Sequence, residues 1–376
     1  MANSMLECLR ERIVQDGALR FDHYWEIVLY EPGLGYYAGG MEKFGADGDF
    51  VTAPGLGRLF GRCLARQLGG LLAACEEPAV LLELGAGDGT LAAQILQQLD
   101  DDGTLCDEYW ILDRSGELRA RQQATLSSLP SHLHERIQWL DTEPRSDWNG
   151  VLFGNEVVDA LAPRRFQFRQ DEWTEAYVDW QDNSLEWSYK EAPPEFVAEL
   201  NRKNPVPAPG TLVEIQTTLG PWLAGLTHHL TRGATVLIDY GYPDREYFAA
   251  ERTMGTLICH DRHRAHDDPL RNPGSIDISV SVNFTALAHA MDTSGITPVA
   301  YLSQAAFLMA NGLGDLLHEL PNLDPEAQLT MANEVKRLTL PAEMGERFQV
   351  LMGLKSSTTD TTDLQHLAPH NRIDRL

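Results

Sequence analysis

The sequence predicts an α/β protein built on a doubly wound, mostly parallel sheet. Apolar runs of strand length alternate with helical patterns between residues 79 and 156, and short connections join them. A glycine-rich turn follows the first run, and successive runs end on acidic or amide side chains. Strands of such a sheet bring their carboxyl ends to one edge, where ligands bind.

The stretch AVLLELGAGDGTL, residues 79–91, supplies the first strand and turn of this sheet. Its apolar run contains one acid, Glu83, and is followed by Gly85, Gly87 and Gly89 before a helical pattern begins. A buried parallel strand has this near-continuous apolar character, and glycine permits a tight turn and close approach of backbone to a ligand. The turn lacks a Walker lysine. Its glycines and its place after the first strand fit a nucleotide-like cofactor at this strand-to-helix connection.

The same patterns predict the remaining elements. We expect further strands at 109–113, 137–141, 150–156, 234–242, 255–259, 276–282, 296–302 and 348–354, and helices at 4–30, 59–74, 90–99, 115–129, 214–230, 284–293 and 324–339. Residues 164–190 alternate polar and apolar side chains around Gln-Asp-Asn-Ser, which predicts an inserted antiparallel hairpin. The proline-rich stretch 193–209 predicts a connector, and the Ser/Thr/Asp-rich residues 356–376 predict a mobile tail.

The length of 376 residues exceeds one ordinary domain and predicts a core with a further subdomain. The expected divisions are an N-terminal helical and glycine-rich cap segment (1–75), a core in two pieces (76–163 and 211–355), the inserted hairpin with its connector (164–210), and the tail (356–376).

Composition limits the partners and the compartment. The net charge of -25 argues against binding a nucleic-acid backbone, which needs a basic face. The five cysteines are scattered without a Cys-x-x-Cys pair, which favours a reducing compartment. The first residues read as an amphipathic helix rather than a targeting peptide, and no run approaches the ~18 apolar residues of a membrane span. These features predict a soluble, cytoplasmic protein of unknown oligomeric state.

Acids after successive strands narrow the choice of cofactor. Glu83, Asp113, Asp141 and the pair Asn155-Glu156 all end predicted strands and should share one crevice. S-adenosylmethionine has no phosphate but carries an ammonium group, ribose hydroxyls, an adenine and a sulfonium cation. Glu83 would hold the amino end, Asp113 the ribose hydroxyls and Asp141 the adenine amino group. The acidic crevice therefore favours S-adenosyl-L-methionine.

A nicotinamide-dependent oxidoreductase is the second interpretation. Its dinucleotide turn requires a third glycine where Thr90 stands, which disfavours it. The position of Asp113 is compatible with either cofactor and does not discriminate between them.

Several stretches, in order over roughly residues 20–355, resemble the MidA-like methyltransferases of bacteria and mitochondria. The resembling stretches are LYEPGLGYY (29–37), GDFVTAPGLGRLFG (48–61), LLELGAGDGTLA (81–92), YWILDRSGELRARQ (109–122), GNEVVDAL (154–161), VLIDYGYP (236–243), GTL (255–257), HRAHDDPLRNPGSIDISVSVNF (263–284) and QAAFL (304–308). The resemblance implies a class I methyltransferase sheet, Rossmann-like, with an additional, partly helical cap. Mitochondrial members are known as respiratory complex I assembly factors that methylate an arginine of a complex I subunit.

The resemblance also implies site residues and a partner. Asn155, Glu156 and Asp159 follow the fourth strand, where this class binds the methyl acceptor, although Asp159 could equally cap a helix. Asp49 and Thr52 lie in the glycine-rich stretch 31–62, which we expect to cover the cofactor. The partner would be a protein with an accessible arginine, such as a respiratory-complex subunit.

The chain departs from the family pattern at several positions, among them Ala162-Pro163 where the family's Asn-Glu-x-x-Asp-Ala-Leu-Pro motif has its proline. Gly55 and Gly57 stand where the family has Glu and Ser in its Pro-Glu-Ile/Leu-Ser motif, and Ser281 and Asn283 stand where it has His and Asp. These changes lie nearer the acceptor side than the cofactor side. They leave open a non-catalytic assembly factor or protein-binding module that keeps the fold.

A cysteine and three histidines (Cys259, His260, His263 and His266) invite a metal interpretation. The segment is charged and lies between expected strands, so a structural or substrate-side loop is favoured and no metal is expected.

Overall fold

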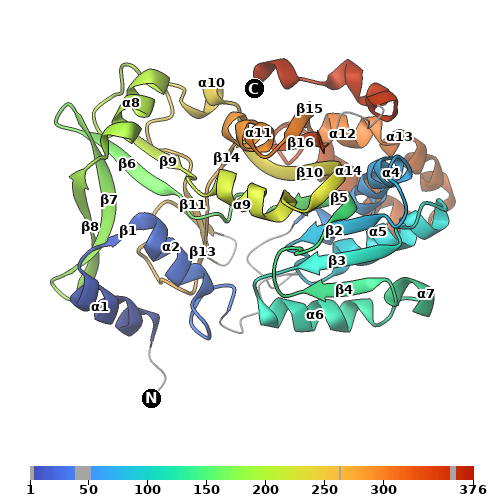
Figure 1. The fold of residues 1–376 in the computed structure, drawn as a ribbon, viewed down its shortest axis with the longest axis horizontal. Helices are drawn as coiled ribbons and strands as arrows, with labels where there is room; N and C mark the ends of the chain where they lie inside the picture. Colours follow the sequence, from blue (N-terminus) through green and yellow to red (C-terminus); the bar gives the residue numbers. More distant parts are fainter. Residues whose placement is uncertain (1–3, 39–51, 262–263, 356–360) are drawn as a thin grey trace. The chain divides into compact units, whose positions relative to one another are not determined.

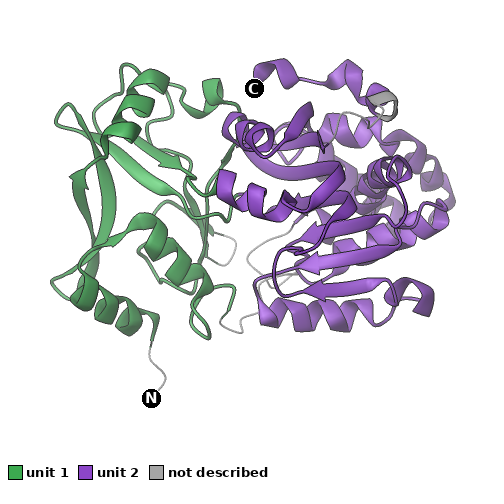
Figure 2. Cartoon of the chain, in the orientation of Figure 1, with its two compact units in different colours: residues 1–50, 159–219, 242–283 green, residues 51–158, 220–241, 284–376 purple. Residues whose placement is uncertain are grey.

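The computed structural model describes residues 4–38, 52–261, 264–355 and 361–376. The chain divides into two compact units, drawn in green and purple in Figure 2. Unit 1 comprises Met1–Phe50, Asp159–Leu219 and Tyr242–Asn283, and unit 2 comprises Val51–Val158, Gly220–Gly241 and Phe284–Leu376. Within the described ranges, no helix combines the length and apolar character needed to cross a membrane.

Unit 2 is built on a mostly parallel sheet with the order β15-β16-β10-β5-β2-β3-β4 (Figure 1). The strands β10, β5, β2, β3 and β4 run parallel, whereas β16 is antiparallel to both of its neighbours. This confirms the predicted doubly wound, mostly parallel sheet. Its strands are β2 (Val80–Leu84), β3 (Glu108–Leu112), β4 (Ile137–Leu140), β5 (Trp148–Asn155), β10 (Leu230–Tyr242), β15 (Ile296–Ser303) and β16 (Phe348–Lys355).

Helices pack on this sheet through their apolar faces. Leu81 and Tyr109 of the sheet share one buried cluster with Leu64 of α4 and Ile95 of α5, so α4 and α5 cover the face to which Glu83 also points. The helical elements of unit 2 are α3 (Ala53–Leu56), α4 (Leu59–Ala73), α5 (Thr90–Asp101), α6 (Gly116–Leu126), α7 (Ser131–His134), α9 (Leu219–Thr227), α11 (Phe284–Thr293), α12 (Gln304–Ala310), α13 (Leu313–Leu316), η1 (Leu317–Asn322), α14 (Pro325–Thr339), η2 (Thr361–His370) and η3 (Ile373–Arg375).

Unit 1 contains an antiparallel sheet of order β1-β7-β6-β9, with β8 paired to β7. The residue pairs Gln170-Asp171 and Asp182-Asn183 join β6 to β7 and β7 to β8, and all four residues have positive φ. Such two-residue turns match the right-handed twist of a hairpin, and the predicted inserted hairpin is confirmed. The elements of unit 1 are α1 (Met5–Asp16), β1 (Leu19–Arg20), α2 (Phe21–Tyr30), β6 (Arg164–Arg169), β7 (Glu172–Gln181), β8 (Ser184–Glu191), α8 (Pro194–Lys203), β9 (Leu212–Ile215), α10 (Asp244–Tyr247), β11 (Ile258–Asp261), β12 (Arg264–His266), β13 (Asp277–Ser279) and β14 (Val282–Asn283).

Three expected elements differ from the structure. The helix predicted at 4–30 is two helices, because Gly17 leaves the helical conformation with φ 82° and a short strand follows. The predicted connector at 193–209 contains α8, which begins with a proline at a position where its missing N–H costs nothing. The helix predicted at 214–230 begins only at Leu219, because Leu212–Ile215 pairs with β6 as strand β9.

Residues 361–376 of the predicted mobile tail (356–376) dock on unit 2, whereas residues 356–360 lie outside the described residues. Leu367 is 1% exposed within the main hydrophobic cluster. Asn371 accepts a hydrogen bond from the Tyr301 backbone N–H at 3.0 Å and donates one to the Val299 carbonyl at 2.8 Å. The Arg372 N–H donates to the Tyr301 carbonyl at 2.7 Å. These bonds hold the tail against β15, the end strand of the sheet.

This docking predicts a stability loss on truncating the buried leucine. Leu367→Ala should lower the free energy of unfolding by about 2–4 kcal/mol, because it removes apolar contact and leaves a cavity. The matched control is Leu329→Ala on α14, where the leucine is 63% exposed and the change should fall within about 0.5 kcal/mol. Urea unfolding measures both. Equal effects of the two substitutions would show that the tail adds little to the fold.

Candidate cofactor and acceptor site

The glycine turn joins β2 to α5 at the carboxyl end of the sheet. Gly85, Gly87 and Gly89 all have positive φ, and the Gly85 N–H donates to the Leu112 carbonyl at 3.0 Å. A Cβ at Gly85 would lie 2.7 Å from a methyl carbon of Val157, whereas a Cβ at Gly87 would meet no described atom within 4 Å. Gly85 is thus needed for packing, and Gly87 leaves its backbone accessible to a ligand.

Glu83 is buried beneath this turn, with 2% of its surface exposed. Its Oε2 accepts a hydrogen bond from the Tyr109 hydroxyl at 2.7 Å. Burial raises the pKa of Glu83 to about 8, the Tyr109 hydrogen bond opposes that rise, and the charges of Asp113 and Asp88 add to it. A carboxyl in this state gains its charge readily when a cation comes close.

Asp113 follows β3 and is held by two donors. The Ser115 N–H donates to Oδ1 and the Gln122 side-chain amide donates to Oδ2, both at 2.9 Å. Burial raises the pKa of Asp113, and both hydrogen bonds act in the opposite direction by stabilising the carboxylate. Each oxygen keeps lone-pair capacity for a further donor, as two adjacent ribose hydroxyls would require.

Asp141 lies apart from this arrangement. Its side chain is 84% exposed and forms an ion pair with Arg119 of α6. Among the residues at the end of β4, it is Trp139 that contacts Gln122, by donating its indole N–H to the Gln122 side-chain oxygen. The structure therefore brings Asp113 and the glycine turn together through Gln122, while Asp141 points to the surface.

Asn155 and Glu156 end β5, the strand beside β2. Glu156 has φ 55°, a left-handed backbone conformation uncommon for a residue with a side chain. The Glu156 N–H donates to the Ile238 carbonyl at 2.9 Å, and the Asn155 amide nitrogen donates to Glu156 Oε1 at 3.1 Å. Asn155 Oδ1 is buried and lacks a hydrogen-bond partner among the described residues. It is an acceptor open to an incoming donor.

Asp239, at the end of β10, fixes the segment after Glu156. Its side chain is fully buried, and its Oδ2 accepts from the Val158 N–H at 3.0 Å. The sequence places an acid at this strand end but does not reveal that it anchors the neighbouring loop. Tyr109 and Gln122 were missed in the same way, although both stand in the resembling stretch 109–122.

The remaining predicted site residues are Asp159, Thr52 and Asp49. Asp159 belongs to unit 1, is 8% exposed, and accepts through its backbone carbonyl from the Val280 N–H at 3.3 Å. Residues 159 and 160 form a turn, and the next element is strand β6 at Arg164, so Asp159 does not cap a helix there. Thr52 occupies the N-cap position of α3 without a side-chain capping bond. Asp49 and the rest of residues 39–51, within the stretch expected to cover the cofactor, lie outside the described residues.

Two departures from the family pattern have local partners. The Glu334 carboxylate accepts from the Leu59 N–H at 2.7 Å at the start of α4, and a Cβ at Gly57 would lie 2.0 Å from Glu334 Oε2. Glycine at 57 thus leaves room for a carboxylate that caps the helix. In unit 1, Asn283 donates to Asp244 Oδ1 at 2.8 Å, and Lys203 also pairs with Asp244. An aspartate at 283 would place a second acid there.

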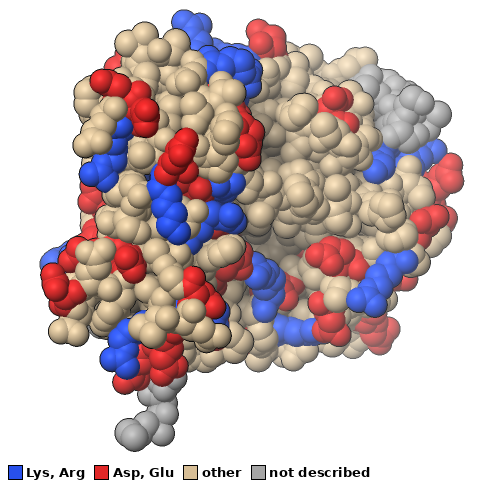
Figure 3. Space-filling model, turned by 60° about the vertical axis from the view of Figure 1, so that its left-hand side comes forward, with Lys and Arg blue, Asp and Glu red and all other residues tan. Residues whose placement is uncertain are grey.

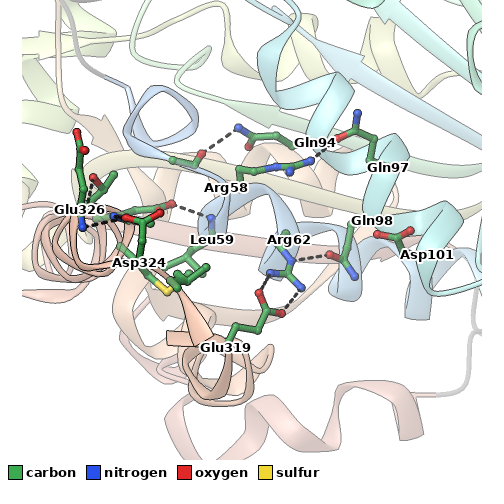
Figure 4. A pocket seen from close by; sticks show the side chains of 16 residues that line it. Arg58, Leu59, Arg62, Gln94, Gln97, Gln98, Asp101, Glu319, Asp324 and Glu326 are labelled. Carbon is green, nitrogen blue, oxygen red and sulfur yellow. Dashed lines mark hydrogen bonds and ion pairs between the residues drawn. The ribbon is translucent and has the colours of Figure 1, made fainter. Parts of the chain in front are cut away.

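A pocket of about 710 Å³ lies beside this helix start, between α4, α5 and α14 (Figure 4). Several of its labelled polar groups pair with each other: Arg62 with Glu319 at 2.8 Å, Arg62 with Gln98 at 2.8 Å, and Arg58 with Gln97. This pocket lies among the helices that cover the sheet and does not include the glycine turn. These pairs join the first part of α4 to α5 and to η1.

Charged side chains are mixed on the face of the molecule shown in Figure 3. On the face shown in Figure 3, acidic and basic side chains are interspersed despite the net charge of -25. The negative charge is therefore not gathered into one patch on this side.

A parallel sheet of this order, with a glycine turn after β2 and an acid after β3, defines the class I methyltransferase fold that binds S-adenosyl-L-methionine. The profile of a family described as S-adenosyl-L-methionine-dependent methyltransferases matches residues 63–302, and the chain belongs to that family. A superfamily member and candidate methyl transferase from Burkholderia thailandensis, crystallised with S-adenosyl-homocysteine, is 38% identical with a TM-score of 0.91. The alignment covers 99% of this chain and 96% of that one.

Curated relatives agree over most of the chain. "Protein arginine methyltransferase NDUFAF7 homolog, mitochondrial" from Drosophila melanogaster is 27% identical, and the alignment covers 93% of this chain and 84% of the relative. The human "Protein arginine methyltransferase NDUFAF7, mitochondrial" is 26% identical, with 92% and 82% covered. The resemblance to MidA-like methyltransferases and the predicted cofactor are confirmed. The expected cytoplasmic location is contradicted by these relatives, whose names place them in mitochondria.

The raised pKa of Glu83 predicts a pH-dependent effect on stability. The carboxyl has a folded pKa of about 8 against an ordinary value of 4.5, so the folded protein holds a proton that the unfolded chain releases in that window. Its stabilising contribution is present below pH 4.5, falls as pH rises to about 8, and then levels off. Glu83→Gln should therefore gain free energy of unfolding over the wild type across that window.

Urea unfolding of the ligand-free proteins at several pH values measures this difference. Tyr109→Phe serves as the comparison, because losing the hydroxyl donor raises the pKa of Glu83 further and extends the window upward. A difference between Glu83→Gln and wild type that stays constant with pH would show that this carboxyl does not titrate there.

The contact between Gly57 and Glu334 predicts that the effect of Gly57→Ser on the free energy of unfolding depends on whether the Glu334 carboxylate is present. Gly57→Ser should displace the carboxylate from the start of α4 and lower the free energy of unfolding by about 1 kcal/mol, since a carboxylate hydrogen bond is worth more than a serine cap. In a Glu334→Ala background the same serine should be neutral or stabilising, because it can then cap the helix itself. Urea unfolding of the four proteins measures the coupling, and equal effects of Gly57→Ser in both backgrounds would rule it out.

Proposed function

We propose that this protein transfers a methyl group from S-adenosyl-L-methionine to an arginine side chain of a protein substrate. The observation that carries the proposal is the pair Asn155-Glu156 at the end of β5. Glu156 adopts a left-handed backbone with φ 55°, and Asn155 Oδ1 is a buried acceptor without a partner among the described residues. Strained residues and open buried acceptors gather at functional sites.

A carboxylate beside an amide oxygen suits the chemistry of an arginine side chain. A guanidinium carries its charge at any physiological pH and presents several N–H donors in a planar fork. Glu156 would accept two of these donors and Asn155 Oδ1 a third, which turns one nitrogen towards the methyl group. The cofactor supplies that methyl group on a sulfonium. As the new C–N bond forms and the S–C bond breaks, the attacking nitrogen loses a proton, which Glu156 can accept and pass to solvent.

The cofactor side of the proposal rests on the acids of β2 and β3. Glu83 lies beneath the glycine turn and would interact with the ammonium group, and Asp113 would accept from the two ribose hydroxyls. Asp141 would have to leave Arg119 before it could reach the adenine, so its role depends on a rearrangement of that ion pair. Thr52 and Asp49 remain proposed contacts from the segment that precedes the sheet.

The names of the curated relatives support arginine as the acceptor, because proteins from fly and human aligned over most of this chain are called protein arginine methyltransferases. A respiratory-complex subunit as the substrate is part of the proposal. The non-catalytic alternative draws less support, since the departures at Gly57 and Asn283 have compensating partners in Glu334 and Asp244. The oxidoreductase alternative loses its basis with the S-adenosyl-homocysteine-bound neighbour.

Glu156→Gln tests the acceptor site. We expect methyl incorporation into arginine to fall about 10²- to 10³-fold, because the amide cannot balance the guanidinium charge. Binding of S-adenosyl-homocysteine should stay within about threefold of wild type. The matched control is Glu135→Gln, at an exposed position after α7, which should leave both quantities unchanged.

The measurement is mass spectrometry of methylated arginine in lysate proteins from cells that lack this protein, after addition of purified enzyme and S-adenosyl-L-methionine. Methylation confined to lysine or to small molecules would overturn the arginine assignment. Full activity of Glu156→Gln would remove Glu156 from the acceptor site while leaving the cofactor site standing.

A further inference from the structure

Gln122 of α6 connects three parts of the cofactor side of the sheet. Its side-chain amide donates to the Gly87 carbonyl at 3.1 Å and to Asp113 Oδ2 at 2.9 Å. Its carbonyl oxygen accepts from the Trp139 indole N–H at 3.1 Å. The side chain is fully buried. One amide thereby links the glycine turn after β2, the acid after β3 and the last residues of β4.

The orientation of this amide is fixed by its partners. Both amide hydrogens are used by acceptors, and the oxygen is used by an indole, which can only donate. A flipped amide would set its oxygen against the Asp113 carboxylate and the Gly87 carbonyl, and would leave the indole facing an NH₂ group. The three partners therefore admit one orientation of the side chain.

The backbone of Gln122 also fits against the turn. A Cβ placed on Gly89 would lie 3.1 Å from Gln122 Cα, so the absence of a side chain at Gly89 lets α6 approach this closely. The approach brings the amide within reach of the Gly87 carbonyl, on the residue whose Cβ position faces open space.

We propose that Gln122 is a positioning residue that holds the Asp113 carboxylate at a fixed place relative to the glycine turn and so sets the affinity for the ribose diol of the cofactor. This rests on the role of Asp113 in the proposed cofactor site. Gln122 directs one lone pair of Oδ2 into the protein, and Ser115 does the same for Oδ1. Each carboxylate oxygen keeps the capacity to accept one further hydrogen bond, so the pair could accept from two adjacent hydroxyls.

The alternative is that Gln122 only stabilises the fold. A fold-stabilising residue would affect every ligand of the turn equally, whereas a positioning residue for Asp113 would affect only ligands that carry the ribose hydroxyls. The two probes are S-adenosyl-homocysteine and its 2′,3′-dideoxy analogue, and the measurement is the dissociation constant of each by calorimetry.

Gln122→Met keeps the size of the side chain and removes all three hydrogen bonds. We expect it to weaken S-adenosyl-homocysteine binding about 10- to 100-fold and the dideoxy analogue less than about threefold, in line with the loss of a charge-assisted hydrogen bond. The matched control is Gln123→Met, the exposed neighbour on the same helix, which should leave both constants unchanged.

Equal weakening of the two ligands by Gln122→Met would overturn the proposal in favour of a structural role. Unchanged binding of both would overturn it as well. Trp139→Phe provides a second variant if Gln122→Met does not fold: it releases only the amide oxygen and should selectively weaken the diol-bearing ligand, by a smaller factor. These binding measurements do not involve an acceptor, so they hold whether or not arginine is the substrate. Failure of the wild type to bind S-adenosyl-homocysteine would instead refute the cofactor site itself.

Discussion

The parallel pairing of β5, β2 and β3 is the constraint on which the site depends. In this register Leu84 lies opposite Leu112 on one side and Gly154 on the other, so the three strands end level. The residues that follow them therefore emerge at one edge: the glycine turn after β2, Asp113 after β3, and Asn155-Glu156 at the end of β5. These residues are far apart in sequence, and the hydrogen bonds between the parallel strands bring them to the same edge of the sheet.

The sequence predicted the parts of the fold in which local pattern and tertiary environment agree. Strands β2, β5 and β10 contain short apolar runs and are buried over most of their length, and α4, α5 and α11 bury apolar residues along one face. Predictions failed where a single residue or a distant partner decides the outcome. Gly17 divides one expected helix into two, and residues 212–215 become a strand because β6 is available to pair with them. The tail has a polar composition, yet Leu367 finds a place in the core.

For the candidate site, the strand-end positions of the acids follow from the sequence, and the roles assigned to them stay predictions. An acid at a strand end can be read from the sequence, and Glu83, Asp113 and Glu156 all lie at the expected edge. What a side chain does there depends on its neighbours. Asp141 has the same sequence context as Asp113, but Arg119 draws it to the surface, whereas Gln122 and Ser115 hold Asp113 inside. Gln122 has no sequence signal of its own, and the strand-end position of Asp239 does not reveal its role, because both matter through the loops that they join.

The docked tail has a consequence for how the molecule meets other chains. β15 ends the sheet order, and the end strand of a sheet presents backbone groups to which a foreign strand can pair. At Tyr301 both backbone groups are already taken, the N–H by Asn371 and the carbonyl by Arg372. The last residues of the chain thus cover this part of the edge strand. A second molecule would have to displace them before it could pair with β15 at Tyr301.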